Sequence, residues 1–207
     1  MSLPFTTDQF LDVFKTYNLF VWPAQIFLVL LALLLILALF KKNGYSDKLI
    51  SFGLAVLWLW MGIVYHYKFF TKINNAAYIF GTLFVIQAGL FLFFGVVKSK
   101  LIFNYKNDLT VIISILFFIY ALIFYPLLGY QLGHIYPGTP TFGLPCPTTI
   151  FTFGFILLLE QRKIIIFIIP VLWSIIGFTA ALKLGIYQDI GLLIAGIISV
   201  IILFSKK

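Results

Sequence analysis

The sequence predicts an all-α integral membrane protein with seven transmembrane helices. Of the 207 residues, 63% are hydrophobic and 10% are charged, whereas soluble domains are about half apolar and about a quarter charged. The mean hydropathy is +1.13, and the apolar residues form long runs with charged residues clustered between them. This composition excludes a soluble enzyme and a disordered chain. A disulfide scaffold is excluded as well, because Cys146 is the only cysteine.

Residues 1–18 predict a short amphipathic helix that precedes a transmembrane domain of residues 19–207. The run from Thr6 to Gln9 matches a capping box, with Thr6 at the N-cap and Gln9 at N3. Three aromatic residues then fall on one helical face, namely Phe10, Phe14 and Tyr17. We expect this helix to lie on the outer membrane surface as a lid or an anchor.

The transmembrane domain contains seven predicted spans. A helix that crosses the hydrocarbon core needs about 20 mostly apolar residues. Seven segments are candidates for such helices: 19–40, 49–69, 76–97, 109–130, 142–159, 164–182 and 186–205. The connections between them are short, and the longest of these, at residues 131–146, is the only one rich in Pro and Gly.

Basic residues predict the orientation of the spans, because cytoplasmic loops carry an excess of Lys and Arg. Ten basic residues fall on one side of the predicted bundle: Lys41, Lys42, Lys48, Lys98, Lys100, Lys106, Arg162, Lys163, Lys206 and Lys207. Four fall on the other side: Lys15, Lys68, Lys72 and Lys183. The difference predicts that the N-terminus is outside and the C-terminus is in the cytoplasm.

The fifth span differs from the other six. Its helical part after Pro147 runs for twelve residues, from Thr148 to Leu159, which is about 18 Å of helix against a core of about 30 Å. We therefore expect an extended, non-helical segment at 140–146 that enters the bundle. Backbone of this kind occurs at membrane depth only where it is buried in protein or lines a cavity.

Two pairs of spans share residues at identical spacing. Pro23 to Phe27 matches Pro147 to Phe151, and Trp58 with Gly62 matches Trp173 with Gly177. These matches suggest a 3+1+3 arrangement of parallel repeats, which is the layout of sugar transporters of the SWEET type. The Pro-Gln signature of that superfamily is absent, and chance matches between apolar segments are the alternative.

Polar residues of the spans gather at the predicted outer ends. No acidic residue or lysine falls in the middle of a span, which argues against a carboxylate proton relay and against a retinal Schiff base. Six side chains form the candidate ligand-binding set: Gln25, His66, His134, Cys146, Thr148 and Asp189.

A metal site is an alternative use of part of this set. His66, His134, Cys146 and Asp189 are ligand types that zinc accepts, although they lack local ligand spacing. Membrane hydrolases of the alkaline ceramidase type use three histidines, and this sequence has two. The sequence specifies neither a metal nor a cofactor.

The sequence also resembles a known family over nearly its whole length. Four segments carry the resemblance: Pro4 to Phe10, Trp22 to Gln25, Trp58 to Gly62 with Tyr65 and His66, and Gly143 to Thr149, which reads GLPCPTT. They are similar to a bacterial multi-pass inner-membrane family of unknown function. The resemblance implies a location in the bacterial inner membrane and implies no activity.

These observations leave three functional hypotheses. The first is a small-solute or ion transporter or binding protein with an outward-facing pocket. The second is a membrane-embedded enzyme, with or without a metal, that acts on a lipid or a periplasmic substrate. The third is a non-catalytic subunit of a membrane complex. The lipid bilayer is the expected partner and a homo-oligomer is compatible with all three, whereas nucleic acid is not expected because the basic residues lie in short loop clusters.

Overall fold

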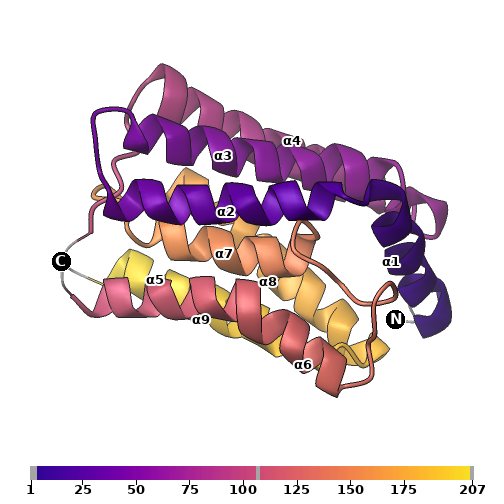
Figure 1. The fold of residues 1–207 in the computed structure, drawn as a ribbon. Helices are drawn as coiled ribbons and strands as arrows, with labels where there is room; N and C mark the ends of the chain where they lie inside the picture. Colours follow the sequence, from indigo (N-terminus) through magenta and orange to yellow (C-terminus); the bar gives the residue numbers. More distant parts are fainter. Residues whose placement is uncertain (1–3, 106–107, 206–207) are drawn as a thin grey trace.

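The structure is a computed structural model that describes residues 4–105 and 108–205, and these residues form helices and no β-strand. The α-helices are α1 Thr7–Val21, α2 Ala24–Phe40, α3 Ser46–Trp60, α4 Ala77–Phe91, α5 Leu109–Ile119, α6 Tyr125–Gln131, α7 Pro145–Ile156, α8 Ile164–Leu184 and α9 Ile190–Phe204 (Figure 1). π-Helical turns extend α3 over Met61–Tyr67 and α4 over Leu92–Val97, and another joins α5 to α6 over Tyr120–Phe124. Single 3₁₀ turns at Phe70–Lys72 and Tyr187–Asp189 follow α3 and precede α9.

Among the described residues, five helical segments are long and apolar enough to cross a membrane: Ser46–Lys72, Ala77–Val97, Leu109–Gln131, Ile164–Leu184 and Tyr187–Phe204. A sixth crossing results if α1 and α2, which are bent by 85°, count as one broken span. The predicted count of seven is therefore not confirmed. The predicted fifth span is the one that is missing from this count. It corresponds to α7, whose 12 residues extend about 18 Å along the helix axis and are too few to cross the core alone.

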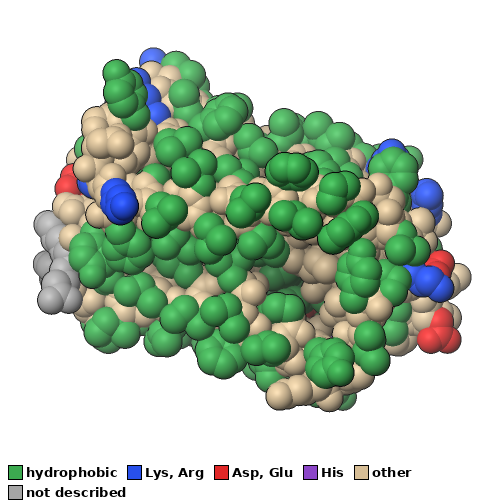
Figure 2. All heavy atoms as spheres, viewed as in Figure 1, with side chains coloured by type: hydrophobic (Ala, Val, Ile, Leu, Met, Phe, Trp, Pro, Cys, Tyr) green, Lys and Arg blue, Asp and Glu red, His purple; other side chains and the backbone are tan. Residues whose placement is uncertain are grey.

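The outer surface of the described bundle is that of a membrane protein. Figure 2 shows hydrophobic side chains along the length of the bundle, with charged side chains toward its two ends. Large apolar residues such as Phe27, Ile79 and Ile201 are more than 60% exposed. Soluble monomers rarely expose apolar patches of such extent, so we treat this surface as facing lipid.

The connections with the most basic residues meet at one end of the bundle. The α2–α3, α4–α5 and α7–α8 connections, which contain Lys41, Lys98 and Arg162, lie at the end where α9 finishes (Figure 1). Helix α1, the α3–α4 turn and the α8–α9 turn lie at the opposite end. This arrangement matches the alternation that the positive-inside rule requires.

Helix α1 crosses the end of the bundle. The predicted capping box is confirmed, because the Thr6 side chain accepts from Gln9 N (3.2 Å) and the Gln9 side chain accepts from Thr6 N (2.9 Å). The helix continues to Val21 and breaks at Pro23, so the break lies later in the chain than the expected boundary between residues 18 and 19.

The aromatic face of α1 packs on protein. Phe14 stacks on Tyr65 with a centroid distance of 6.2 Å, and Tyr17 meets Phe69 edge to face at 5.6 Å. The Tyr17 hydroxyl also accepts a hydrogen bond from Trp60 Nε1 (2.7 Å). The aromatic face of α1 is thus buried against the end of α3.

Helix α7 is the central element of the bundle. Its residues are buried along the whole helix, apart from Cys146, which is partly exposed. Helices α5, α8 and α9 surround it, and Trp58 of α3 donates a hydrogen bond from Nε1 to Thr152 Oγ1 (3.0 Å). A helix enclosed by protein does not have to match the thickness of the bilayer, which explains its short length.

The expectation of a non-helical segment up to residue 146 is wrong at its C-terminal end. Helix α7 begins at Pro145, so both Pro145 and Pro147 lie in its first turn. Proline is tolerated there because the first N–H groups of a helix have no partner within the helix. The extended chain stops at Leu144, and Gly143 before it adopts φ +97°, a conformation that favours glycine.

The proposed internal repeat is not confirmed. Helix α2 exposes Ile26, Phe27 and Leu30 on its outer face, whereas its suggested counterpart α7 is enclosed by protein. Trp58 donates a hydrogen bond to Thr152, whereas Nε1 of its suggested counterpart Trp173 has no partner in the described structure. The paired positions therefore have different surroundings.

Candidate functional site

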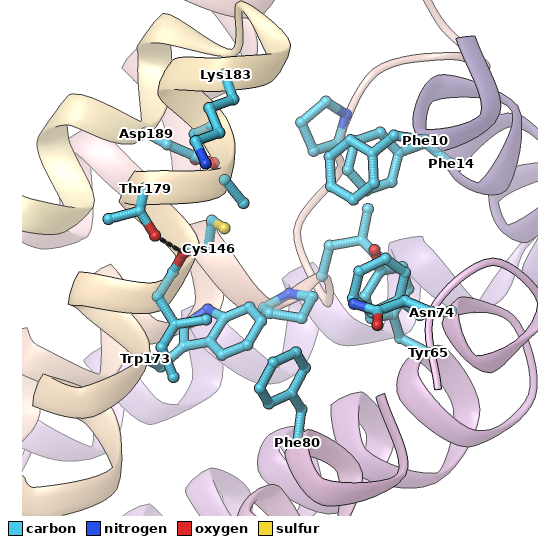
Figure 3. Close-up of a pocket in the computed structure, with 18 of the residues that line it drawn as sticks. Phe10, Phe14, Tyr65, Asn74, Phe80, Cys146, Trp173, Thr179, Lys183 and Asp189 are labelled. Carbon is cyan, nitrogen blue, oxygen red and sulfur yellow. Dashed lines mark hydrogen bonds between the residues drawn. The ribbon is translucent and has the colours of Figure 1, made fainter. Parts of the chain in front are cut away.

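A cavity of about 160 Å³ lies at the α1 end of the bundle. It is bounded by α1, the end of α3, the first turns of α4 and α7, and the second half of α8 (Figure 3). Aromatic residues are the largest group in its wall, and they are Phe5, Phe10, Phe14, Tyr65, Phe70, Phe80, Tyr125 and Trp173. We call this space the α1 cavity.

One end of the α1 cavity is polar and combines Tyr125, Cys146 and Asp189. Asp189 is 4% exposed, and its Oδ1 accepts a hydrogen bond from the Tyr125 hydroxyl (2.5 Å). Cys146 lines the same end of the cavity. Because these residues lie at the starts of α6, α7 and α9, three chain segments distant in sequence form this polar end.

Trp173 and Gly177, one turn apart on α8, lie next to the polar end. Trp173 is 7% exposed, and its Nε1 is buried without a hydrogen-bond partner in the described part of the chain. A Cβ atom at Gly177 would lie 3.4 Å from Trp173 Nε1 and 3.5 Å from Cys146 Sγ. The same Cβ would lie 3.0 Å from Leu192 Cδ2, so the glycine allows Trp173, Cys146 and Leu192 to pack closely around this turn of α8.

The cavity opens beside the last two turns of α8. Thr179 and Lys183 line it and are exposed, and Ala180 between them is partly exposed. Figure 3 shows Lys183 on this side and Asn74 on the opposite wall. A ligand can thus enter from the side of the bundle, close to the end where α1 lies.

The structure brings together two of the six predicted site residues, Cys146 and Asp189. His66 lies behind the cavity wall. Its ring is fully buried, packs against Phe84 and Trp173 at centroid distances of 4.7 and 5.2 Å, and has no hydrogen-bond partner for either nitrogen among the described residues.

The other three predicted residues lie outside the α1 cavity. His134 is near the α8–α9 turn, with Nδ1 3.4 Å from Gln188 Nε2. Gln25 donates to the backbone oxygen of Asn18 (3.0 Å). The Thr148 hydroxyl accepts from Gly143 N (3.0 Å), which holds the extended chain against the first turn of α7.

The four residues considered for a metal site are dispersed. No group of three or more His, Cys, Asp and Glu side chains within residues 4–105 and 108–205 has the proximity that a metal ion requires. Cys146 and Asp189 are close to each other, but neither histidine lines the cavity that they share.

Sequence reasoning missed several residues that shape the site. Tyr125 was absent from the candidate set although it is a tyrosine within a span, and Trp173 and Gly177 were noted only as part of the suggested repeat. Asn18 was also missed. It is fully buried, and an asparagine within the apolar run before Pro23 was a signal that could have identified it.

Comparisons with known proteins assign the chain to a family but give no activity. A family model described as a family of unknown function (DUF6064) matches residues 7–207. No curated protein matches the chain, and no solved structure matches it.

Proposed function

We propose that this chain, which belongs to a family of unknown function (DUF6064), is a multi-pass membrane protein that binds a small amphipathic molecule in the α1 cavity. The proposed location is the bacterial inner membrane, with α1 outside and the end of α9 in the cytoplasm. The cavity would then open on the outer side. The unequal distribution of basic residues supports this orientation.

The observation that carries the proposal is an aromatic cavity that ends in a buried carboxyl group. Ligand sites are typically apolar spaces with a few polar groups that fix the orientation of the ligand. An ionisable residue within a membrane bundle is costly to bury and is found mainly where function requires it. Asp189 is 4% exposed and lines the α1 cavity together with the thiol of Cys146.

Binding is better supported by the structure than transport. On the inner side of the cavity, Trp58, Phe84 and His66 fill the bundle with rings that are at most 1% exposed. Trp58 and Phe84 are in contact with a centroid distance of 4.5 Å. Transport would require these rings to move apart, whereas binding requires only the cavity as it stands.

The native cysteine provides a test of the binding proposal. Because Cys146 is the only cysteine, N-ethylmaleimide reports on the α1 cavity in the unmodified protein. In lipid nanodiscs we expect Cys146 to be labelled, and we expect saturating acetophenone or isopropylbenzene to slow the labelling. Both probes combine a ring with a short substituent and are of a size that fits the cavity.

Two controls accompany this experiment. Cys146→Ser should remove the labelling, and Gly177→Val, which places a branched side chain in the cavity, should abolish protection by either probe. If neither probe changes the labelling rate of the wild-type protein, the proposed function is wrong.

A further inference from the structure

We infer that the α1 cavity selects a neutral ligand that carries a hydrogen-bond acceptor, such as a carbonyl oxygen, and that Trp173 Nε1 is the donor that recognises it. This inference rests on the proposed function and specifies its class of ligand. It assigns a specificity-determining role to Trp173.

One tryptophan N–H in the cavity wall has no acceptor among the described residues. A tryptophan N–H can only donate, and it usually finds an acceptor when it is buried. In this protein Trp58 Nε1 donates to Thr152 Oγ1 (3.0 Å), and Trp60 Nε1 donates to the Tyr17 hydroxyl (2.7 Å). Trp173 Nε1 is buried and has no acceptor in the described structure, although its side chain lines a cavity.

The unpaired indole N–H belongs to a residue of the cavity wall. Trp173, Gly177 and Cys146 all line the α1 cavity, and an ideal Cβ at Gly177 would lie 3.0 Å from Leu192 Cδ2, 3.4 Å from Trp173 Nε1 and 3.5 Å from Cys146 Sγ. A ligand oxygen in the α1 cavity beside Trp173 would accept from the indole N–H. The rest of the ligand would then lie against the aromatic wall, which Phe80 forms together with the Trp173 ring at a centroid distance of 5.5 Å.

The acidic residue in the cavity favours a neutral ligand. Asp189 lies at the same end of the cavity, and an anionic ligand group placed beside it would be repelled at low local dielectric. A cationic group could approach the carboxyl group but could not accept a hydrogen bond from Trp173 Nε1. A neutral acceptor on an aromatic or alicyclic body satisfies the indole donor and avoids the repulsion.

The test compares two probes that differ at one position. Acetophenone and isopropylbenzene have similar shapes, but the first has a carbonyl oxygen where the second has a methyl group. Protection of Cys146 from N-ethylmaleimide in nanodiscs gives an apparent affinity for each probe, measured in wild-type protein and in Trp173→Phe. Because each probe partitions equally into the nanodiscs of both proteins, comparing the variants isolates the contribution of the indole N–H.

We expect Trp173→Phe to weaken acetophenone binding about tenfold and to change isopropylbenzene binding by less than about twofold, because the substitution keeps an aromatic ring. The matched control is Trp22→Phe, a tryptophan that is 60% exposed, and it should leave both affinities unchanged. An equal effect of Trp173→Phe on the two probes, or no effect on either, overturns the inference.

A measurement on wild-type protein keeps the inference testable if Trp173→Phe does not fold. In ¹⁵N–¹H spectra of indole-labelled protein, acetophenone should shift one tryptophan N–H resonance in the direction of stronger hydrogen bonding, and isopropylbenzene should not. If both probes protect Cys146 but the spectra respond to them identically, the cavity binds ligands without this recognition. If neither probe protects Cys146, the proposed function itself fails.

Discussion

At the scale of single residues, Asn18 shows how one buried polar side chain joins separate parts of the molecule. Its Nδ2 donates to the backbone oxygens of Pro137 and Thr139 (2.7 Å each), and its Oδ1 accepts from the Thr141 hydroxyl (2.8 Å) and from Gln25 Nε2 (3.2 Å). Every donor and acceptor of the amide is therefore in use. Through these bonds α1 is fixed to the start of α2 and to the segment that leads into α7.

We expect Asn18→Ala to reduce the free energy of unfolding by about 2–3 kcal/mol, because it leaves several buried polar groups without partners. Thermal unfolding of the purified protein in detergent measures the effect. Asn75→Ala, at an exposed asparagine, is the matched control and should change little. An Asn18→Ala variant as stable as the control would show that the hydrogen bonds of Asn18 contribute little to stability.

At the scale of elements, close helix packing depends on small residues. A Cβ at Gly196 of α9 would lie 2.1 Å from Ser174 Oγ and 2.7 Å from Ser174 Cβ on α8. A Cβ at Gly89 of α4 would meet no atom within 4 Å. Only Gly196 is therefore required by helix packing, because its lack of a side chain lets α8 and α9 approach closely.

We expect Gly196→Ala to destabilise the protein by about 1–3 kcal/mol, because the added methyl group forces α8 and α9 apart. Gly89→Ala should be neutral or stabilise by up to about 1 kcal/mol, because alanine favours the helix. Thermal unfolding of the two variants under the same conditions makes the comparison. Equal effects of the two substitutions would contradict the packing of α8 against α9.

Helix α1 covers one side of the cavity, and Phe14 fixes it there. Phe14 is 5% exposed, lines the cavity and stacks on Tyr65. We expect Phe14→Ala to loosen α1 and to speed the labelling of Cys146 by N-ethylmaleimide several-fold, since exposure of the thiol limits its reaction. Leu19→Ala, at a residue that is 57% exposed, is the control and should leave the labelling rate unchanged. If Leu19→Ala speeds labelling and Phe14→Ala does not, the covering role of α1 is refuted.

At the scale of the whole molecule, the distribution of charge predicts how the bundle sits in the membrane. The connections that contain Lys41, Lys98 and Arg162 lie at one end, and α1 lies at the other. The described helices include five segments able to span a membrane, and α1 with α2 adds a sixth if they form one broken span. The short α7 lies inside the bundle, and its connection to α8 reaches the end that contains Arg162.

Reporter fusions test this orientation. Fusions after Lys42, Lys100 and Lys207 should give cytoplasmic signals, and a fusion after Lys72 should give an external one, because the basic connections remain inside. A cytoplasmic signal from the Lys72 fusion would contradict both the orientation and the outward opening of the α1 cavity.

The sequence alone determined the class of the molecule and its local features. Apolar runs and their lengths identified helices in a membrane, the spacing of Thr6 and Gln9 identified the start of α1, and the prolines around Cys146 identified a short helix. These properties follow from residues that are close together in the chain. Hydropathy and helix capping depend on neighbouring residues, so both can be predicted without the tertiary structure.

Only the tertiary structure decided which polar residues meet. Cys146 and Asp189 were both candidates, but His66 and His134 were equally plausible in the sequence, and helix packing excluded both histidines from the cavity. Tyr125 reaches Asp189 across 64 residues of chain, and the placement of α7 inside the bundle brings Cys146 to the same point. Such contacts depend on the relative rotation and depth of several helices, which side-chain packing over the whole bundle determines and which no local pattern encodes.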